Sequence, residues 1–246
     1  MVPTTGAREM APHSGRGLNE IRHIPEDRAA QGGEIPGTVQ VGALALWRSS
    51  LLPGAIARLV TQHPSVKVVT NESAFSNLVT ELRAGDVDLI LGALRQNDSV
   101  PDLDNRVLFN EELVLIARPQ HPLAGKPLLP ANFGHTQWIL PRENSPARQL
   151  LDRAFQRLGM APPTPVVESG DLAIIRGLLL NSDMVAAVSS HQLAYELRAG
   201  ILKPLSFALP DTHRAIGLTL RQGALHSPAT LALIASIDAE ARTDAS

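Results

Sequence analysis

Residues 38–92 alternate between short apolar runs and amphipathic segments, and this alternation limits the possible folds more than any other feature of the chain. The runs at 38–43, 66–69 and 88–92 have the length and composition of buried strands, and each segment between them repeats apolar residues at helical spacing. Strands separated by helices at this distance are joined by right-handed crossovers, which place the strands parallel in one sheet. The sequence therefore predicts an α/β fold.

The helices of this stretch have recognisable ends. Leu52, Ile56 and Leu59 define one apolar face of the first helix. This helix should end before Pro64, because the residue that precedes a proline disfavours the helical conformation. Gly85 follows the second helix at a position typical of a glycine that caps a helix C-terminus.

A second series of the same kind follows. Strands are expected at 137–140, 165–167 and 184–188, again separated by helices. The chain then returns with a strand at 216–220 and a helix at about 228–241. The second unit is thus expected to be inserted before the last strand and helix of the first, with two crossings between them. This plan is typical of a two-lobed, hinged binding protein whose cleft lies between the lobes.

Composition narrows the functional classes. The 246 residues include no cysteine, which excludes disulfides, thiolate metal sites and cysteine nucleophiles. A net charge of −2 argues against a strongly basic nucleic-acid surface. No apolar run approaches the roughly 18 residues that a membrane span requires, and the N-terminus shows no secretory signal pattern. The expected location is the cytoplasm.

A set of short motifs carries a family resemblance over roughly residues 18–237. In order along the chain they are GTVQVG at 37–42, LLP at 51–53, HP at 63–64, LRAGDVDL at 82–89, LFNEELVL at 108–115 and HPL at 121–123. Together they resemble the effector-binding domain of LysR-type transcriptional regulators. Within that family, the details are most similar to regulators of the galactose-binding-protein-regulator type.

The resemblance implies a type 2 periplasmic-binding-protein-like fold, in which two Rossmann-like lobes joined by two hinge crossings hold a small-molecule effector. It also implies side-by-side antiparallel dimers, here expected through the face around Ile56, Leu59 and Val60. The family carries a winged helix-turn-helix ahead of this domain, but residues 1–36 offer no recognition helix or basic arm. The chain thus resembles a truncated regulator, or one whose N-terminus has been lost or replaced. Sequence-specific DNA binding is not expected of this chain alone.

The expected division of the chain combines these patterns. Residues 1–16 are predicted to be disordered, and 17–36 resemble the remnant of the family's linker helix followed by a linker. The first lobe is expected to comprise 37–117 together with 211–241, and the second lobe 118–210.

Polar breaks follow four of the predicted strands. In an open parallel sheet, ligands bind beyond the carboxyl ends of the strands, where helix N-termini present free N–H groups and the positive end of the helix dipole. Each break contains a serine, which can cap the following helix and also contact a ligand. The candidate ligand-binding residues in these breaks are Trp47, Arg48, Ser49, Ser50, Asn71, Ser73, Arg142, Asn144, Ser145 and Ser169.

Simpler roles exist for several of these residues. Each serine can be an ordinary N-cap, which contributes about 1 kcal/mol. Arg48 and Arg142 can pair with an anionic effector, or they can be solvated loop arginines. Trp47 can stack on a sugar or aromatic ring, or it can form a partly buried wall of the hinge. The polar groups together suit a sugar, a sugar acid or an aromatic or other carboxylic acid.

Little in the sequence supports an enzyme. The chain contains no phosphate loop ending in Gly-Lys-Ser/Thr, no His-Glu-x-x-His and no Gly-x-Ser-x-Gly. Glu72 and Glu168 follow strands, but no catalytic partner can be named for either. No metal or cofactor is expected. The sequence predicts a non-catalytic effector-sensing domain of a LysR-type regulator, and the alternative is a free-standing solute-binding protein of the same fold.

Overall fold

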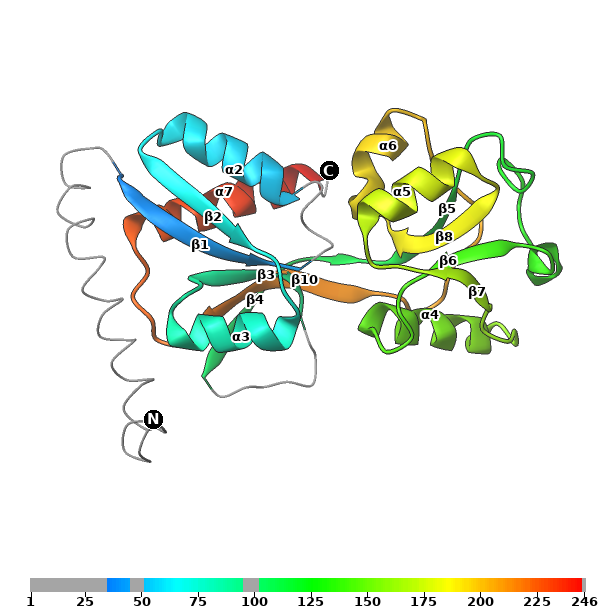
Figure 1. The fold of residues 1–246 in the computed structure, drawn as a ribbon, viewed down its shortest axis with the longest axis horizontal. Coiled ribbons are helices and arrows are strands. Elements are labelled where there is room, and N and C mark those ends of the chain that lie inside the picture. The colour runs from blue at the N-terminus through cyan, green and yellow to red at the C-terminus, as the bar shows by residue number, and fades with distance from the viewer. Residues whose placement is uncertain (1–34, 45–50, 95–101, 245–246) are drawn as a thin grey trace, which may run out of the picture. The chain divides into compact units, whose positions relative to one another are not determined.

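The computed structural model describes residues 35–44, 51–94 and 102–244, which belong to two compact units (Figure 1). Unit 1 contains the chain up to Phe109 and resumes at Ala215, and unit 2 comprises 110–214. Unit 2 is thus inserted into unit 1, and the chain passes between the units twice.

The sheet of unit 1 has the strand order β2-β1-β3-β10-β4. β1 pairs in parallel with both β2 and β3, as the alternating pattern predicts. β10 is antiparallel to β3, because the chain returning from unit 2 enters the sheet beside the carboxyl end of β3. The strands are β1 (Gly37–Ala43), β2 (Val66–Asn71), β3 (Leu89–Ala93), β4 (Leu103–Glu111) and β10 (Arg214–Arg221).

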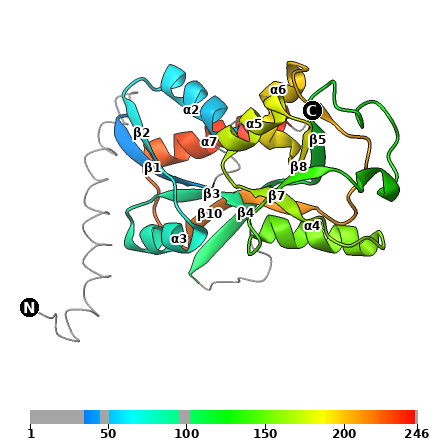
Figure 2. The ribbon, with the colours of Figure 1, turned by 45° about the vertical axis from the view of Figure 1, so that its right-hand side comes forward.

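Helices cover both faces of this sheet (Figures 1 and 2). α2 (Leu51–Gln62) and α7 (Pro228–Asp244) lie on one face, where Leu59 is fully buried. α3 (Phe75–Ala84) covers the other face and packs its own apolar cluster against the sheet. Gly85 has φ 82° and caps α3 in the left-handed conformation that glycine adopts readily, which confirms the predicted helix end.

The sheet of unit 2 repeats this plan with the order β7-β6-β8-β5-β9. β6 is parallel to β7 and β8, and β5 is antiparallel to β8. In both sheets, therefore, the strand that follows a crossing from the other unit runs antiparallel to its neighbour. The strands are β5 (Leu113–Ala117), β6 (Gln137–Leu140), β7 (Pro165–Glu168), β8 (Met184–Ser189) and β9 (Lys203–Pro204).

Helices also cover both faces of the second sheet (Figures 1 and 2). α4 (Pro146–Arg157) packs on one face, and α5 (Leu172–Asn181) with α6 (Ala194–Arg198) packs on the other. Two short 3-10 turns, η2 (Pro130–Phe133) and η3 (Ser190–Leu193), connect these elements. Each unit therefore has a helix–sheet–helix arrangement with its own core.

One sequence expectation is corrected by these elements. β5 was expected in the first lobe, but it pairs with β8 and β9 in the second sheet, so the units divide after Phe109 rather than after residue 117. Adjacent strands separated by one residue, such as β4 and β5, give no local signal of which sheet each joins.

The predicted disorder of residues 1–16, and nearly all of the predicted linker at 17–36, lie outside the described residues. Within the described ranges, no helix combines the length and the apolar content that crossing a membrane requires.

His226, just before α7, should make the stability of unit 1 depend on pH. Partial burial lowers the pKa of this imidazole from 6.5, Arg221 lowers it further, and Asp88 opposes the shift. The unfolded chain therefore binds more protons in the window just below pH 6.5, so stability should fall as the pH drops through that window. Melting temperatures between pH 7.5 and 5 should decline less steeply in His226→Gln. The His213→Gln variant, which changes an exposed residue, should show the same decline in melting temperature as the wild type. A wild-type decline in His226→Gln would contradict the assignment of the pH dependence to His226.

Candidate functional site

The carboxyl edge of the first sheet is built around the end of β2. Asn71 donates from Nδ2 to the carboxylate of Glu81 on α3 at 2.5 Å, which ties the strand to the helix. The hydroxyl of Ser73 accepts a hydrogen bond from the Asn77 side chain at 3.0 Å. The N-cap of α3 is Ala74, which has no side-chain cap, so Ser73 is not the capping residue.

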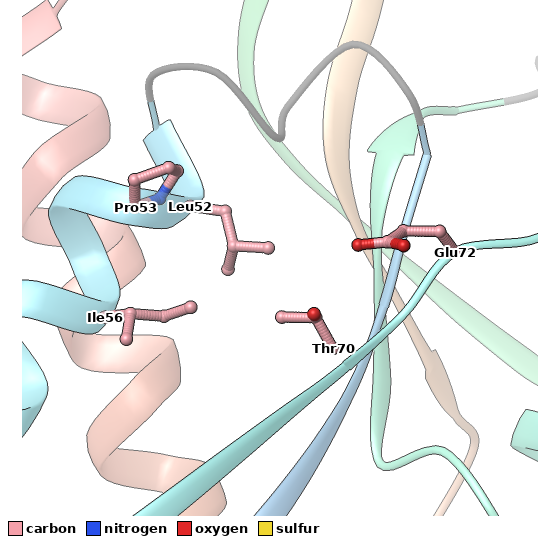
Figure 3. A pocket seen from close by; sticks show the side chains of 5 residues that line it. All are labelled: Leu52, Pro53, Ile56, Thr70 and Glu72. Carbon is pink, nitrogen blue, oxygen red and sulfur yellow. The ribbon is translucent and has the colours of Figure 1, made fainter.

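A small pocket lies beside this edge (Figure 3). The Glu72 carboxylate, beyond the end of β2, points toward the apolar side chains of α2. The cavity holds about 120 Å³, whereas pockets for small organic ligands usually start at about 300 Å³. It is therefore too small to be the principal ligand site. The lining residues are Leu52, Pro53, Ile56, Thr70 and Glu72.

The carboxyl edge of the second sheet presents the start of α4. Ser145 is the N-cap of this helix, because its hydroxyl accepts the backbone N–H of Arg148 at 3.2 Å. Pro146 follows at the first helical position, where the missing N–H of proline is tolerated. Arg142 and Asn144 lie exposed on the loop before the cap. Ser145 therefore has the simpler role of an N-cap. The same helix N-terminus can still bind a ligand.

Arg148 is a buried cation at this edge that the sequence analysis missed. Its Nε donates to Asp152 at 2.8 Å, and its Nη1 donates to Glu168, at the end of β7, at 3.1 Å. Burial alone would lower the pKa of Arg148, but the hydrogen bonds to the two carboxylates outweigh it and raise the pKa. The guanidinium therefore remains charged and joins α4 to β7. The sequence signal that could have indicated this ion pair is the i, i+4 spacing of Arg148 and Asp152, which places both side chains on one helix face.

The turn between β7 and α5 holds Ser169 in a buried position. Its hydroxyl accepts the N–H of Asp171 at 3.0 Å. Asp171, rather than Ser169, caps α5, since its carboxylate accepts the N–H groups of Ala173 at 2.8 Å and Ile174 at 3.3 Å. An aspartate at an N-cap also places negative charge at the positive end of the helix dipole.

A second buried ion pair lies where β4 ends and β10 begins. Glu111 is fully buried at its side chain, and Arg214 donates from Nε to its Oε1 at 2.5 Å. Ser189, at the carboxyl end of β8, donates its hydroxyl to Oε2. His191 Nδ1 stands 4.0 Å from the same oxygen. Glu111 and Arg214 are 103 residues apart in the sequence, so no short motif predicts that they meet.

The remaining predicted site residues, Trp47, Arg48, Ser49 and Ser50, lie outside the described residues. Within unit 2, Ser145, Ser169 and the loop residues Arg142 and Asn144 occupy turns at the carboxyl ends of neighbouring strands β6 and β7. Convergence of the edges of the two units on one pocket remains a prediction. In the part of the chain that the structure describes, no group of three or more His, Cys, Asp or Glu residues is arranged to hold a metal ion.

Two α/β units with matching strand order, one inserted into the other, define the class of two-lobed binding domains, and comparison with known proteins specifies the family. Residues 32–242 match the LysR substrate binding domain, and the chain belongs to that family. The expected type 2 periplasmic-binding-protein-like fold is thereby confirmed.

Relatives with transcriptional roles match most of the chain. It is 54% identical over 237 residues to the HTH-type transcriptional regulator GalR of Pseudomonas putida, which covers 96% of this chain and 60% of GalR. It is 27% identical over 213 residues to the HTH-type transcriptional regulator PcaQ of Agrobacterium fabrum, with 85% and 68% covered. The chain thus spans about three fifths of the GalR length.

Solved structures support the fold. The effector binding domain of QuiR in complex with shikimate matches with a TM-score of 0.67 and 19% identity, covering 85% of this chain and 98% of that one. The cofactor-binding domain of the Cbl transcriptional regulator matches with a TM-score of 0.70 and 20% identity, covering 83% and 89%.

Proposed function

We propose that this chain is the effector-sensing domain of a LysR-type transcriptional regulator and binds a small polar or anionic ligand between its lobes. The observation that carries the proposal is the repeated strand order of the two sheets, which places helix starts at the carboxyl edge of parallel strands in both units, with polar caps at α4 and α5. Such edges are where open α/β sheets bind ligands, because helix N-termini supply donors there.

Binding would act as a signal by favouring one arrangement of the lobes. A ligand shifts such an equilibrium only to the extent that it binds one state better than the other. In the proposed mechanism, closure of the two lobes on the ligand is passed to a second copy of the chain. In the proposed regulator, DNA would be bound through a helix-turn-helix domain of the kind named in the relatives GalR and PcaQ.

A thermal-shift screen tests the ligand class directly. Sugars, sugar acids and aromatic or other carboxylic acids, shikimate among them, should be compared at matched ionic strength. A ligand present at 100 times its dissociation constant stabilises the native state by about 2.7 kcal/mol, which is readily detected as a rise in melting temperature. A failure of every class to shift the transition would contradict the proposal, as would a complex with the ligand bound away from both carboxyl edges.

Replacing Ser145 with alanine should have two separable effects. Loss of the cap should lower the free energy of unfolding by about 1 kcal/mol, because the N–H of Arg148 loses its acceptor. If the hydroxyl also contacts the ligand, affinity should fall about 5- to 30-fold, since an unpaired ligand atom costs about 1–2 kcal/mol. Urea denaturation measures the first effect, and calorimetric titration with a hit from the screen measures the second.

Ser227→Ala is the matched control for this variant. Ser227 accepts the N–H of Thr230 at 3.1 Å at the start of α7, which follows β10 at the opposite edge of the first sheet. The control should lose stability without losing affinity. Wild-type affinity in Ser145→Ala would remove Ser145 from the site.

Self-association should be visible in solution as a dimer. Leu59 cannot form the dimer contact expected from the sequence, because it is fully buried within unit 1. The exposed part of that face is Val60, at 39% exposure, beside the half-buried Ile56. Light scattering at tens of micromolar should give twice the 26.3 kDa chain mass. Val60→Glu should shift this toward the monomer, whereas Val107→Glu on β4 should not. A monomeric wild type would contradict the prediction.

A further inference from the structure

Glu111 and Arg214 stand at the two places where the chain passes between units. The chain leaves unit 1 after Phe109 and returns to it after Arg214. Glu111 is the last residue of β4, and Arg214 is the first residue of β10. The hydrogen bond from Arg214 Nε to Glu111 Oε1 therefore fastens the two crossing segments to each other on the unit 2 side.

The other oxygen of Glu111 faces the end of β8. Ser189 donates its hydroxyl to Oε2, and the same hydroxyl accepts the N–H of His191 at 3.3 Å. The backbone N–H of Ser189 is bound in turn by the Gln192 side chain at 3.2 Å. The side chain of Glu111 is 0% exposed, so water cannot easily replace either partner. One carboxylate thus joins the turn after β8 to both crossings.

We propose that Glu111 is a positioning residue that transmits displacement of the β8 end to the two crossing segments. Hydrogen bonds to a carboxylate are strong and directional, and members of a buried network depend on one another. A shift of Ser189 must therefore be followed by Glu111, or one of its hydrogen bonds is lost. This proposal rests on the proposed function in one respect. It takes the carboxyl end of β8 to lie at the edge of the sheet where the ligand binds.

Hydrogen–deuterium exchange of the unliganded chain tests this link without a known ligand. Ser189→Ala removes a single hydroxyl from β8. Amides at 110–113 and 214–216 should then exchange about tenfold faster or more, as expected when one hydrogen bond to a charged group is lost. Amides of α4, in the same unit, should keep their wild-type rates. Glu111→Gln, which keeps the side-chain size, should produce the same pattern and also accelerate 189–193.

The neighbouring Glu112→Gln is the matched control. This substitution removes a negative charge from an exposed side chain that lies 3.9 Å from His213. It should leave the exchange rates of the amides at 110–113, 189–193 and 214–216 unchanged. Unchanged exchange at 214–216 in Ser189→Ala would overturn the proposal, because no transmission would occur. Equal acceleration throughout unit 2 would also overturn it, since that is general destabilisation. A failed ligand screen would leave this result intact and would count only against the proposed function.

Discussion

Replacing Arg214 with methionine should lower the free energy of unfolding by about 3–5 kcal/mol, because removing one partner of a buried ion pair leaves an uncompensated charge. Here the remaining charge would be Glu111, whose side chain is fully buried. Glu111 also accepts the Ser189 hydroxyl and lies 4.0 Å from the His191 ring, but neither group replaces a guanidinium. Urea denaturation followed by circular dichroism measures the loss.

Two further variants separate this effect from ordinary loss of charge. Arg118→Met breaks an exposed pair with Asp183 in the same unit and should lower the stability far less than Arg214→Met. Arg214→Met combined with Glu111→Met should recover part of the loss, because apolar replacement of a whole buried pair is often tolerated. A cost below about 1 kcal/mol for Arg214→Met would show that Glu111 does not depend on Arg214 for its place in the core.

Phe155→Ala should destabilise unit 2 by about 3–5 kcal/mol, the usual cost of deleting a buried aromatic ring. Phe155 is 1% exposed on α4, and its ring meets Trp138 edge to face at 5.7 Å. Phe133 and Phe207 complete the cluster, so four of the chain's eight aromatic residues gather in this core. The near-ultraviolet circular dichroism of Trp138 should weaken together with the loss of stability.

Tyr195→Ala provides the comparison. Tyr195 is 51% exposed on α6, where Arg198 lies 4.9 Å from its ring centre. Its removal should change the stability by no more than about 0.5 kcal/mol, as is usual for surface positions. Similar effects of the two substitutions would mean that the aromatic cluster does not form the core of unit 2.

The local order of helices and strands was readable from the sequence. Pro64 and Gly85 mark helix ends that the structure keeps, and Ser145 is the N-cap of α4, one of the roles expected for the serines of the polar breaks. Such features depend on a few neighbouring residues, through backbone restriction, capping and apolar periodicity. The family motifs also predicted the fold class, because they occur in order along most of the chain. The match to the family confirms this prediction.

The residues of the candidate site could be predicted from the sequence only in part. The sequence placed serines at the right turns, but it could not say which would cap a helix. Ser145 does so, whereas Ala74 and Asp171 hold the corresponding positions of α3 and α5. Capping depends on the turn geometry that the preceding strand imposes, so neighbouring Ser and Asp residues in one break are indistinguishable in sequence.

By itself, the sequence determined two α/β units with one inserted into the other, together with the polar strand ends. Only the tertiary structure decided that β5 pairs in the second sheet, that Leu59 is interior, and that Glu111 meets Arg214. Periodicity tells which face of an element is apolar but not which partner covers it. A contact between residues 103 positions apart depends on β10 and β4 lying side by side in one sheet, so no local pattern could have revealed it.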